Sequence, residues 1–325
     1  MKVLVVGGAG YIGSHMVLML SERGHEVVVL DDLSTGHREA VLAGEFVEGS
    51  MADAQLLDRL FAAHRFDGVM HFASYIQVGE SVLAPAKYYR NNVANTLVLL
   101  DAMVRHGVRH FIFSSTAAVY GEPLRVPIDE THPCAPINPY GRSKRMVEEI
   151  LADYDRAHGL KSVCLRYFNA AGADPQGRIG ELHEPETHLI PLVLQAAAGR
   201  RPHLTVFGTD YSTRDGTCIR DYIHVVDLCS AHLLALERLV QGAGSAVYNL
   251  GHGKGFSIRE VVAAAERVTG RPVPVVEGPR REGDPAILVA SPERALRELR
   301  WRPERSDLER IIADAWAFHA RRWNA

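Results

Sequence analysis

Short apolar runs alternate with amphipathic stretches over the first half of the chain. The runs lie at residues 2–8, 25–32, 45–50, 67–73, 109–115 and 162–168. They are apolar through their centres, which suits strands of a parallel sheet that is covered by helices on both faces. Stretches with helical periodicity separate the runs, among them residues 12–24 and 91–107. Strands that alternate with helices predict an α/β fold, a Rossmann-type doubly wound parallel sheet.

The alternation stops after Phe168. Residues 169–218 are rich in Gly, Pro, His and Thr, which predicts loops around one helix at 189–200. Helical periodicity returns at 221–239, and the apolar run 246–251 is predicted to add one more strand to the sheet.

The remainder of the chain predicts a helix at 257–270, a strand at 273–278 and further helices. These elements would form a smaller C-terminal α/β lobe. We therefore expect two domains, one of residues 1–168 with about 219–250 and one of residues 169–218 with 251–325.

Composition and charge narrow the possible functions. Hydrophobic residues make up 47% of the 325 residues and charged residues 23%, as in ordinary soluble globular proteins. The formal net charge of −3 gives no basic footprint for nucleic acid or an anionic membrane. No apolar run approaches the roughly 18 residues of a membrane span, and the first run is too short for a signal peptide.

The four cysteines are Cys134, Cys164, Cys218 and Cys229. They lie far apart and include no Cys-x-x-Cys pair, so the sequence indicates neither a zinc site nor a disulfide framework. We expect reduced thiols and a cytoplasmic location.

A glycine-rich turn follows the first apolar run directly. Gly8, Gly10 and Gly13 have the spacing of the dinucleotide fingerprint, and Gly7 begins an overlapping match. Such glycines let the backbone approach a pyrophosphate, which then faces the N-terminus of the next helix. Asp31 ends the second strand, where a carboxylate accepts a hydrogen bond from the adenosine ribose 2′-hydroxyl. Because that carboxylate would repel a 2′-phosphate, the sequence favours NAD over NADP.

A tyrosine and a lysine share one face of a predicted helix. Tyr140 and Lys144 lie four residues apart, so their side chains point the same way. A free phenol, with a pKa of about 10, is a poor base at neutral pH. A cation within roughly 4–6 Å lowers the pKa of an acid by about 1–3 units, so Lys144 and an oxidised nicotinamide would make Tyr140 a better general base. Thr116 ends the fifth strand, at the sheet edge where ligands bind, and is expected to hold a substrate hydroxyl.

Several motifs together resemble a known group of enzymes. The glycine turn, Thr116 and the Tyr140-x-x-x-Lys144 pair resemble the extended short-chain dehydrogenase/reductases. More specifically, the chain is similar to the UDP-glucose 4-epimerase family through the stretches GGAGYIGSH, VGES, SSTAAVYGEP, PYGRSK, LRYFNAAGA, RDYIHVVDL, YNLG and REGDPA. These stretches cover nearly the whole chain and follow the family's order.

The resemblance implies a reaction, a cofactor and three catalytic residues: Thr116, Tyr140 and Lys144. Enzymes of this family interconvert UDP-glucose and UDP-galactose. A tyrosine removes the proton from the sugar 4-hydroxyl while hydride passes from C4 to tightly bound NAD. The flat 4-keto sugar then turns and takes the hydride back on its other face.

The resemblance also implies which residues bind each ligand. NAD is expected to contact Gly7, Gly10, Tyr11, Ile12, Gly13, Asp31, Asp32, Ser50, Met51, Phe72, Ala73, Asn91, Ser114, Tyr140, Lys144 and Tyr167. The UDP-sugar is expected to contact Thr116, Asn169, His188, Leu189, Phe207, Arg220, Arg281, Asp284 and Leu288. The arginines would hold the diphosphate, which suits the guanidinium fork. Many family members have Asp in place of Ser50 and some have Lys in place of Ile76. The chain departs from the family pattern at these two positions, and the property that they would affect is its affinity for NAD.

Two further expectations rest on the resemblance. A homodimer is expected, in which the helices at 91–107 and 143–159 pack against their copies as a four-helix bundle. Leu288 is expected to border the 2-substituent of the sugar. Because leucine is smaller than the aromatic side chain that would exclude an N-acetyl group, slow action on UDP-N-acetylglucosamine is expected beside UDP-glucose.

Other activities on the same fold remain alternatives. A sugar-nucleotide dehydratase carries Asp-Glu directly after the threonine, and a UDP-glucuronate decarboxylase carries Glu at the second position. This chain has Ala117 and Ala118 there, which cannot transfer protons. An epimerase acting on UDP-pentoses or UDP-uronates and a non-catalytic NAD-binding protein stay open.

One stretch superficially resembles a metal site. Residues 183–188 read HEPETH, but Pro185 and the five-residue spacing of the histidines do not fit a helical His-Glu-x-x-His motif. We predict a loop there and no metal ion.

Overall fold

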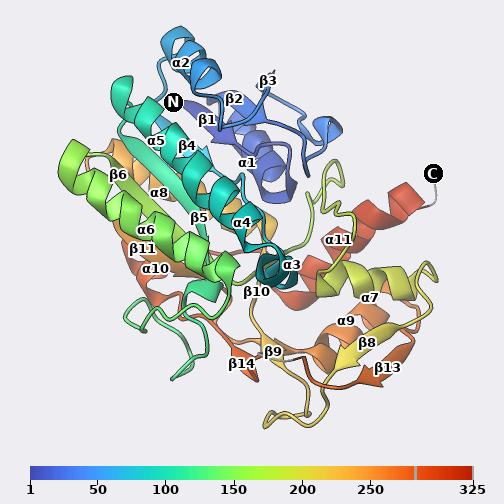
Figure 1. The fold of residues 1–325 in the computed structure, drawn as a ribbon. Coiled ribbons are helices and arrows are strands. Elements are labelled where there is room, and N and C mark those ends of the chain that lie inside the picture. The colour runs from blue at the N-terminus through green and yellow to red at the C-terminus, as the bar shows by residue number, and fades with distance from the viewer. Residues whose placement is uncertain (282–283, 324–325) are drawn as a thin grey trace.

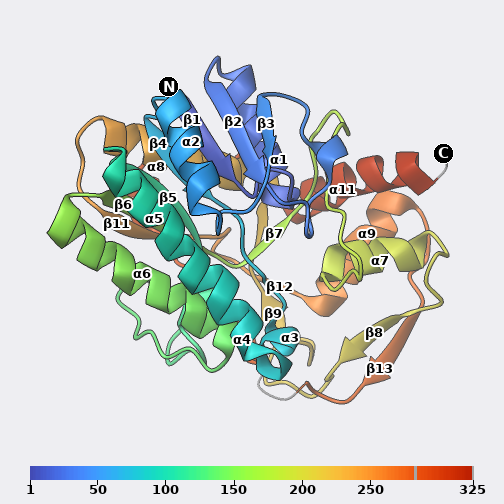
Figure 2. The same cartoon turned by 45° about the horizontal axis from the view of Figure 1, so that its top comes forward.

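The computed structural model describes residues 1–281 and 284–323. Seven strands form one parallel sheet in the order β11-β6-β5-β4-β1-β2-β3 (Figures 1 and 2). They are β1 (Lys2–Val6), β2 (Glu26–Asp31), β3 (Glu45–Glu48), β4 (Gly68–His71), β5 (His110–Thr116), β6 (Lys161–Tyr167) and β11 (Ala246–Leu250). The predicted Rossmann-type fold is confirmed.

Alternate residues of each central strand face opposite layers of helices. Val3 and Val5 of β1 pack into one core, whereas Leu4 and Val6 pack into the other, as the two-residue period of a strand requires. The first layer contains α1 (Tyr11–Glu22), α8 (Val225–Val240) and α10 (Glu293–Glu298). The second contains α2 (Ala54–Ala63), α5 (Asn95–Arg105) and α6 (Pro139–His158). Both faces are therefore covered, which explains why the strands are apolar throughout.

Short helices lead into α5 and bridge the loops. These are η1 (Arg38–Ala40), α3 (Val78–Leu83), α4 (Pro85–Tyr88), the π-helical turn η2 (Tyr89–Ala94) and η3 (Ala117–Val119). The predicted helix at 91–107 is thus a π-helical turn that continues into α5. The turn η3 follows the end of β5 directly, so it lies at the carboxyl edge of the sheet.

A smaller lobe is built from short sheets and three helices. Its strand pairs and triplet are β7 (Asn169–Ala171) with β10 (Tyr222–His224), β8 (Leu204–Phe207) with β13 (Val275–Gly278), and β9 (Ile219–Arg220) between β12 (Phe256–Ser257) and β14 (Ile287–Leu288). A separate core joins the helices α7 (Leu189–Ala197), α9 (Ile258–Thr269) and α11 (Leu308–Trp323). Figures 1 and 2 show this lobe beside one end of the large sheet.

Three details of the lobe differ from the sequence prediction. Residues 221–239 were predicted to be helical, but Tyr222–His224 form β10 before α8 begins. Two segments within the predicted loop region, β7 and β8, are strands. Each of these segments pairs with a strand distant in sequence, so local periodicity could not reveal them.

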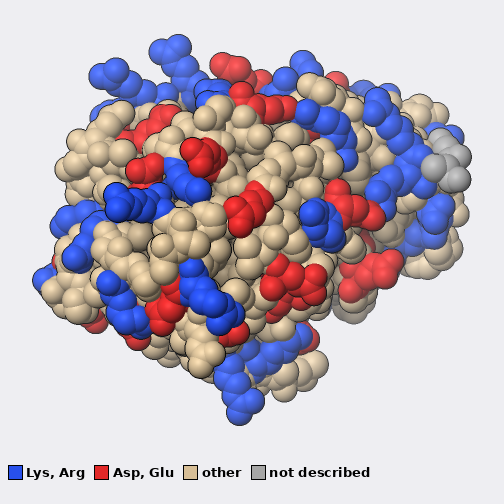
Figure 3. Space-filling model, turned by 90° about the horizontal axis from the view of Figure 1, so that it is seen from above, with Lys and Arg blue, Asp and Glu red and all other residues tan. Residues whose placement is uncertain are grey.

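The surface carries both signs of charge. Lys and Arg side chains are intermingled with Asp and Glu side chains over the face shown in Figure 3. Among the helices of the described residues, none combines the length and the apolar character that crossing a membrane would require.

Candidate active site

The glycine turn between β1 and α1 has no room for side chains. Gly7 has a φ of +82°, and a Cβ on Gly7 would lie 2.5 Å from the Ala73 backbone nitrogen. A Cβ on Gly13 would lie 2.1 Å from the Gly7 carbonyl oxygen. The turn therefore packs directly against the end of β4 and against its own helix. At the same time it exposes the first N–H groups of α1, which have no intrahelical acceptor.

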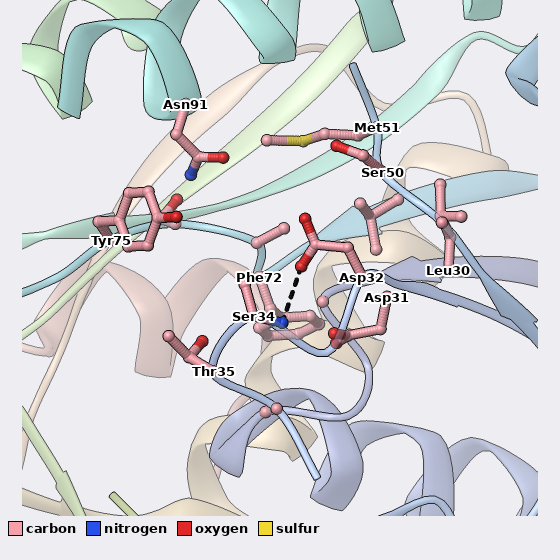
Figure 4. Close-up of a pocket in the computed structure, with 17 residues that line it drawn as sticks. Leu30, Asp31, Asp32, Ser34, Thr35, Ser50, Met51, Phe72, Tyr75 and Asn91 are labelled. Atoms are coloured by element: carbon pink, nitrogen blue, oxygen red, sulfur yellow. Dashed lines mark hydrogen bonds between the residues drawn. The ribbon is translucent and has the colours of Figure 1, made fainter. Parts of the chain in front are cut away.

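A concave cleft, the usual form of a small-molecule site, opens beside this turn. Most of the predicted NAD residues line it: Gly7, Gly10, Asp31, Asp32, Ser50, Met51, Phe72, Ala73 and Asn91 (Figure 4). The cleft thus collects groups from the ends of β1, β2, β3 and β4. The glycine turn leaves no room for a Cβ, so its backbone can approach the diphosphate of NAD. The two carboxylates on one wall of the cleft can bind the ribose of NAD.

The two carboxylates at the end of β2, those of Asp31 and Asp32, are held in different ways. Asp31 accepts hydrogen bonds from the N–H groups of Ala9 and Leu33, both at 2.8 Å. Burial raises the pKa of the Asp31 carboxyl, and these two bonds oppose the rise. Asp32 accepts one hydrogen bond, from Ser34 N–H at 3.0 Å (Figure 4). Asp31 thus fixes the glycine turn, and each of its oxygens keeps a lone pair for a ribose hydroxyl.

Sequence reasoning missed several lining residues. Ser34, Thr35, Gly36, Ser74 and Tyr75 also border the cleft. The first three begin two residues after Asp32, so the small and hydroxyl side chains of this turn could have been included from their position alone. Ser74 and Tyr75 lie just beyond β4, at the same carboxyl edge.

The predicted catalytic tyrosine stands in the first turn of α6. The Asn138 side chain caps this helix by accepting a hydrogen bond from Gly141 N–H at 2.8 Å, and Pro139 occupies the first turn. Tyr140 is only 9% exposed. Burial raises the pKa of the Tyr140 phenol, and a hydrogen bond with Thr116 opposes the rise. The structure therefore brings Thr116 and Tyr140 together.

The predicted lysine lies one turn further along α6 and is 2% exposed. Its Nζ donates to Ser74 Oγ and to the Ser114 carbonyl oxygen, both at 2.8 Å, and lies 4.8 Å from the centre of the Phe113 ring. Burial lowers the pKa of Lys144 to about 7, against an opposing effect of Glu148. The expected lowering of the Tyr140 pKa by Lys144 is not seen: burial raises this pKa, and the hydrogen bond with Thr116 is the one opposing cause.

A buried ion pair lies behind this group. Glu148 stands one turn after Lys144 and pairs with Arg166 of β6, with Arg166 Nε 2.9 Å from Glu148 Oε1. Ser115 Oγ donates to Glu148 Oε1 at 2.6 Å, and Arg166 donates to the Tyr120 hydroxyl at 2.9 Å. Glu148 therefore ties α6 to β6 through Arg166 and to the end of β5 through Ser115, the residue before Thr116. The four-residue spacing from Lys144 was the one signal for Glu148 in the sequence.

Other predicted NAD residues lie outside the cleft lining. Ser114 Oγ lies 3.1 Å from His232 Nε2, and the centre of the Tyr167 ring lies 6.2 Å from that of the same histidine. The Tyr11 hydroxyl donates to the Gly172 carbonyl at 2.7 Å, and the Ile12 carbonyl accepts from Cys229 Sγ at 3.7 Å. Tyr11 and Ile12 thus anchor the start of α1 through side chain and backbone.

The predicted substrate residues form two groups in the small lobe. Arg220 of β9 pairs with Asp284, and Leu288 of β14 is the register partner of Arg220. Leu288 packs against the Val119–Tyr120–Ile128 cluster, which begins three residues after the predicted catalytic Thr116. The Arg281 guanidinium stacks 4.0 Å from the centre of the Phe207 ring. Residues 282 and 283, in the middle of the REGDPA stretch, lie outside the described residues.

Three predicted substrate residues flank the loop between β7 and α7. The Asn169 side chain donates to the Asp221 carbonyl at 2.8 Å. His188 precedes Leu189, the first residue of α7, and its ring lies against two carboxylates, those of Glu181 and Glu186. The prediction that the HEPETH stretch is a loop is confirmed, because no helix lies between β7 and α7 among the described residues.

Comparison with known proteins agrees with this geometry. The UDP-glucose 4-epimerase of Halalkalibacterium halodurans is 53% identical, over 98% of this chain and 96% of its own. The crystal structure of UDP-glucose 4-epimerase from Brucella ovis in complex with NAD is 53% identical, has a TM-score of 0.95 and aligns over 97% of both chains. The UDP-Glc/GlcNAc 4-epimerase of Campylobacter jejuni is 45% identical, with a TM-score of 0.86 over 98% of this chain and 99% of its own.

The match to a family model covers most of the chain. It spans residues 3–251 and is described as the NAD dependent epimerase/dehydratase family. NAD is the cofactor of this family, in agreement with the cleft at the glycine turn. The chain belongs to the NAD dependent epimerase/dehydratase family, and its relatives there are UDP-glucose 4-epimerases.

Proposed function

We propose that the chain interconverts UDP-glucose and UDP-galactose at C4 of the sugar. The observation that carries this proposal is the meeting of Thr116 with Tyr140, one turn of helix from Lys144, whose Nζ donates to Ser74 in the wall of the glycine cleft. Epimerase activity, isomerisation and dependence on NAD agree with the similarity to UDP-glucose 4-epimerases over nearly the full chain.

The residues of the chain supply placement and proton transfer. NAD, when bound, supplies the hydride acceptor and a positively charged ring. Thr116 positions the sugar 4-hydroxyl, and Tyr140 accepts its proton and later returns one. Because burial raises the pKa of the Tyr140 phenol, its anionic form needs a nearby positive charge. The Lys144 ammonium, on the same face of α6, is the charge that the chain offers.

The small lobe would hold the nucleotide and leave the sugar free to turn. Arg220 and Arg281 would bind the diphosphate, and Phe207 would border the uracil, as the resemblance implies. Arg220 has five N–H donors and uses only part of them in its contacts with Asp284 and the Ile219 carbonyl. An anchor at the nucleotide end lets a keto sugar present either face to the same catalytic group.

The structure gives a reason to prefer epimerisation over dehydration or decarboxylation. Ala117 and Ala118 begin η3 directly after Thr116, and Ala118 N–H donates to Thr116 Oγ1 at 3.1 Å. Their methyl groups offer no acid or base beside the catalytic threonine. The two extra proton transfers of a dehydratase would therefore lack a residue.

We also propose the domain division, the location and the assembly that the sequence suggested. Residues 1–168 with about 219–250 would bind NAD, and 169–218 with 251–325 would bind the UDP-sugar.

The four cysteines are free thiols, which supports a cytoplasmic location. The helices α5 and α6 lie side by side on the outside of the molecule, and Met146 of α6 is exposed, which supports a homodimer through these helices (Figures 1 and 2).

One assay tests the activity. Purified protein is incubated with UDP-galactose without added NAD, and the UDP-glucose formed is measured by coupled oxidation. We expect conversion without added cofactor, since the reaction regenerates it. A protein that binds NAD but leaves UDP-galactose unchanged would be a non-catalytic NAD-binding protein, and conversion confined to UDP-pentoses or UDP-uronates would redefine the substrate.

A second substrate is proposed on a specific observation. Leu288 is partly buried between β9 and the Val119–Tyr120–Ile128 cluster, where an aromatic ring would take up more of the space. We infer slow action on UDP-N-acetylglucosamine beside UDP-glucose. Similarity to the UDP-Glc/GlcNAc 4-epimerase of Campylobacter jejuni supports this proposal.

A further inference from the structure

Four potential metal ligands converge in the loop between β7 and α7. They are Glu181, His183, Glu186 and His188, and one ligand atom from each lies within 4.8 Å of the others. None of the four belongs to the proposed catalytic group of Thr116, Tyr140 and Lys144, although the resemblance places His188 among the UDP-sugar contacts. The sequence argument against a metal considered only a helical arrangement, whereas here a loop brings the side chains together.

The contacts within the cluster leave a small common centre. Glu181 Oε1 lies 3.1 Å from His183 Nδ1 and 2.8 Å from His188 Nδ1. Glu186 Oε1 lies 3.2 Å from His188 Nδ1. Around a tetrahedral zinc ion, with bonds of about 2.0–2.2 Å, ligand atoms are separated by roughly 3.3 Å. Three of the separations are thus within half an ångström of the zinc arrangement.

Neither of the two carboxylates has a lysine or arginine partner among the described residues. The side chains of Glu181 and Glu186 are only 4% and 7% exposed. Among the ion pairs of the described residues, neither carboxylate pairs with Lys or Arg, and histidines alone face them. Burying two carboxylates so close together is costly unless a positive charge lies between them.

The backbone holds the ligands in place. Glu186 Oε1 also accepts hydrogen bonds from the N–H groups of Thr187 at 2.7 Å and His188 at 2.8 Å. His37 donates from Nε2 to the Leu182 carbonyl at 3.2 Å, which ties the loop to the segment after β2. His183 lies edge-on to Tyr11, with ring centres 6.5 Å apart. The cluster is therefore anchored on both sides.

We propose that Glu181, His183, Glu186 and His188 bind one zinc ion. Two imidazoles and two carboxylates form a nitrogen and oxygen donor set that suits this metal, and its charge balances the two carboxylates. All four tetrahedral positions come from the chain, so the site is structural rather than catalytic. The ion fastens the loop that connects β7 to α7, at a point where this loop meets the start of α1.

The test measures zinc binding directly. Protein that retains its NAD is freed of metal with a chelator, exchanged into chelator-free buffer and titrated with zinc chloride in a calorimeter. We expect one zinc per chain. Because even the outer partners of metal ligands change affinity by about 10–100-fold, loss of a direct ligand in His183→Ala or Glu181→Gln should raise the Kd by at least about tenfold. Circular dichroism and bound NAD report whether each variant is folded.

A matched control separates the cluster from isolated histidines. His64 faces Glu45 at 3.5 Å and belongs to no such cluster, so His64→Ala should bind zinc as the wild type does. Cobalt(II) in place of zinc should give the absorption of a four-coordinate site in the wild type and in His64→Ala, and lose it in His183→Ala.

A proton could fill the same position instead of a metal. Although burial lowers the pKa of His188, its contacts with Glu181 and Glu186 raise it to about 10. If protonated His188 rather than zinc neutralises the two carboxylates, the wild type and His183→Ala should bind zinc equally weakly. That result would overturn the proposal, as would equal losses in His64→Ala and His183→Ala.

Discussion

The carboxyl edge of the large sheet and the small lobe hold their functional groups in different ways. At the sheet edge, Tyr140 and Lys144 are nearly inaccessible to water and are fixed by hydroxyl groups and a backbone carbonyl. In the small lobe, Arg220 and Arg281 are fixed by one carboxylate and one aromatic ring, and the Asp284 side chain remains 27% exposed. We propose that the first region excludes water around the proton transfer and that the second admits the charged diphosphate.

The difference teaches where each property of the enzyme resides. Groups that act on the reacting atoms gain from a dry, fixed environment, because electrostatic effects are stronger there. Groups that bind a large anion can stay partly hydrated until the ligand arrives. Changes at the sheet edge should therefore affect turnover and folding, and changes in the lobe should affect which sugar is accepted.

The largest effect is expected at the tyrosine. Tyr140→Phe removes the transferable proton and keeps the ring, so turnover should fall by about 10²–10⁴-fold while the fold and bound NAD persist. Initial rates with UDP-galactose and the absorbance of bound NAD measure both. Tyr154→Phe, which alters a partly buried tyrosine further along α6 that bonds to Asp101 of α5, should leave turnover unchanged. Comparable rates for the two variants would remove Tyr140 from the mechanism.

The buried ion pair behind the sheet edge should dominate stability. Glu148→Gln leaves the Arg166 guanidinium buried without its charge partner, which costs about 3–5 kcal/mol. The neighbouring Glu149 pairs with Arg145 at the surface, so Glu149→Gln should cost less than about 1 kcal/mol. Denaturant unfolding of both variants gives the comparison. If both variants lost the same unfolding free energy, the Glu148–Arg166 pair would not stabilise the carboxyl edge of the sheet.

The lysine should give stability a distinct pH dependence. Burial lowers the pKa of Lys144 to about 7 in the folded chain, against an opposing effect of Glu148, and an unfolded lysine has a pKa of about 10.4. Between these values the unfolded state binds the extra proton, so this group adds about 1.4 kcal/mol of stability per pH unit as pH rises. Unfolding free energies of wild type and Lys144→Met should therefore diverge in favour of the wild type from about pH 7 to 10. A constant difference would contradict the lowered pKa.

The smallest effect is expected at the sugar pocket in the lobe. Leu288→Tyr should suppress action on UDP-N-acetylglucosamine relative to UDP-glucose, and Leu288→Gly should enhance it, because size exclusion is worth about 1–3 kcal/mol. The ratio of kcat/KM values for the two substrates measures this. Ile287→Ala, on the opposite face of β14, should leave the ratio unchanged. The same ratio in all four proteins would show that Leu288 does not set the specificity.

Prediction from sequence succeeded where structure follows local patterns. The alternating runs predicted the seven-stranded sheet, and the glycine spacing placed the cleft between β1 and α1. It was wrong for residues 222–224 and missed β7 and β8, because these strands form only by pairing with distant partners. Short segments have no periodicity of their own that outweighs such pairing.

The sequence by itself determined the layers of the fold, the glycine turn, and the shared helix face of Tyr140 and Lys144, because each depends on spacings within one element. Only the tertiary structure decided the electrostatic surroundings of these groups. Burial raises the pKa of Tyr140 and lowers that of Lys144, and burial is a property of every element packed around them. The pairing of Glu148 with Arg166 and the meeting of two glutamates with two histidines in one loop likewise depend on how the chain packs. Charge and hydrogen-bond partners act across space, so residue spacing alone cannot specify them.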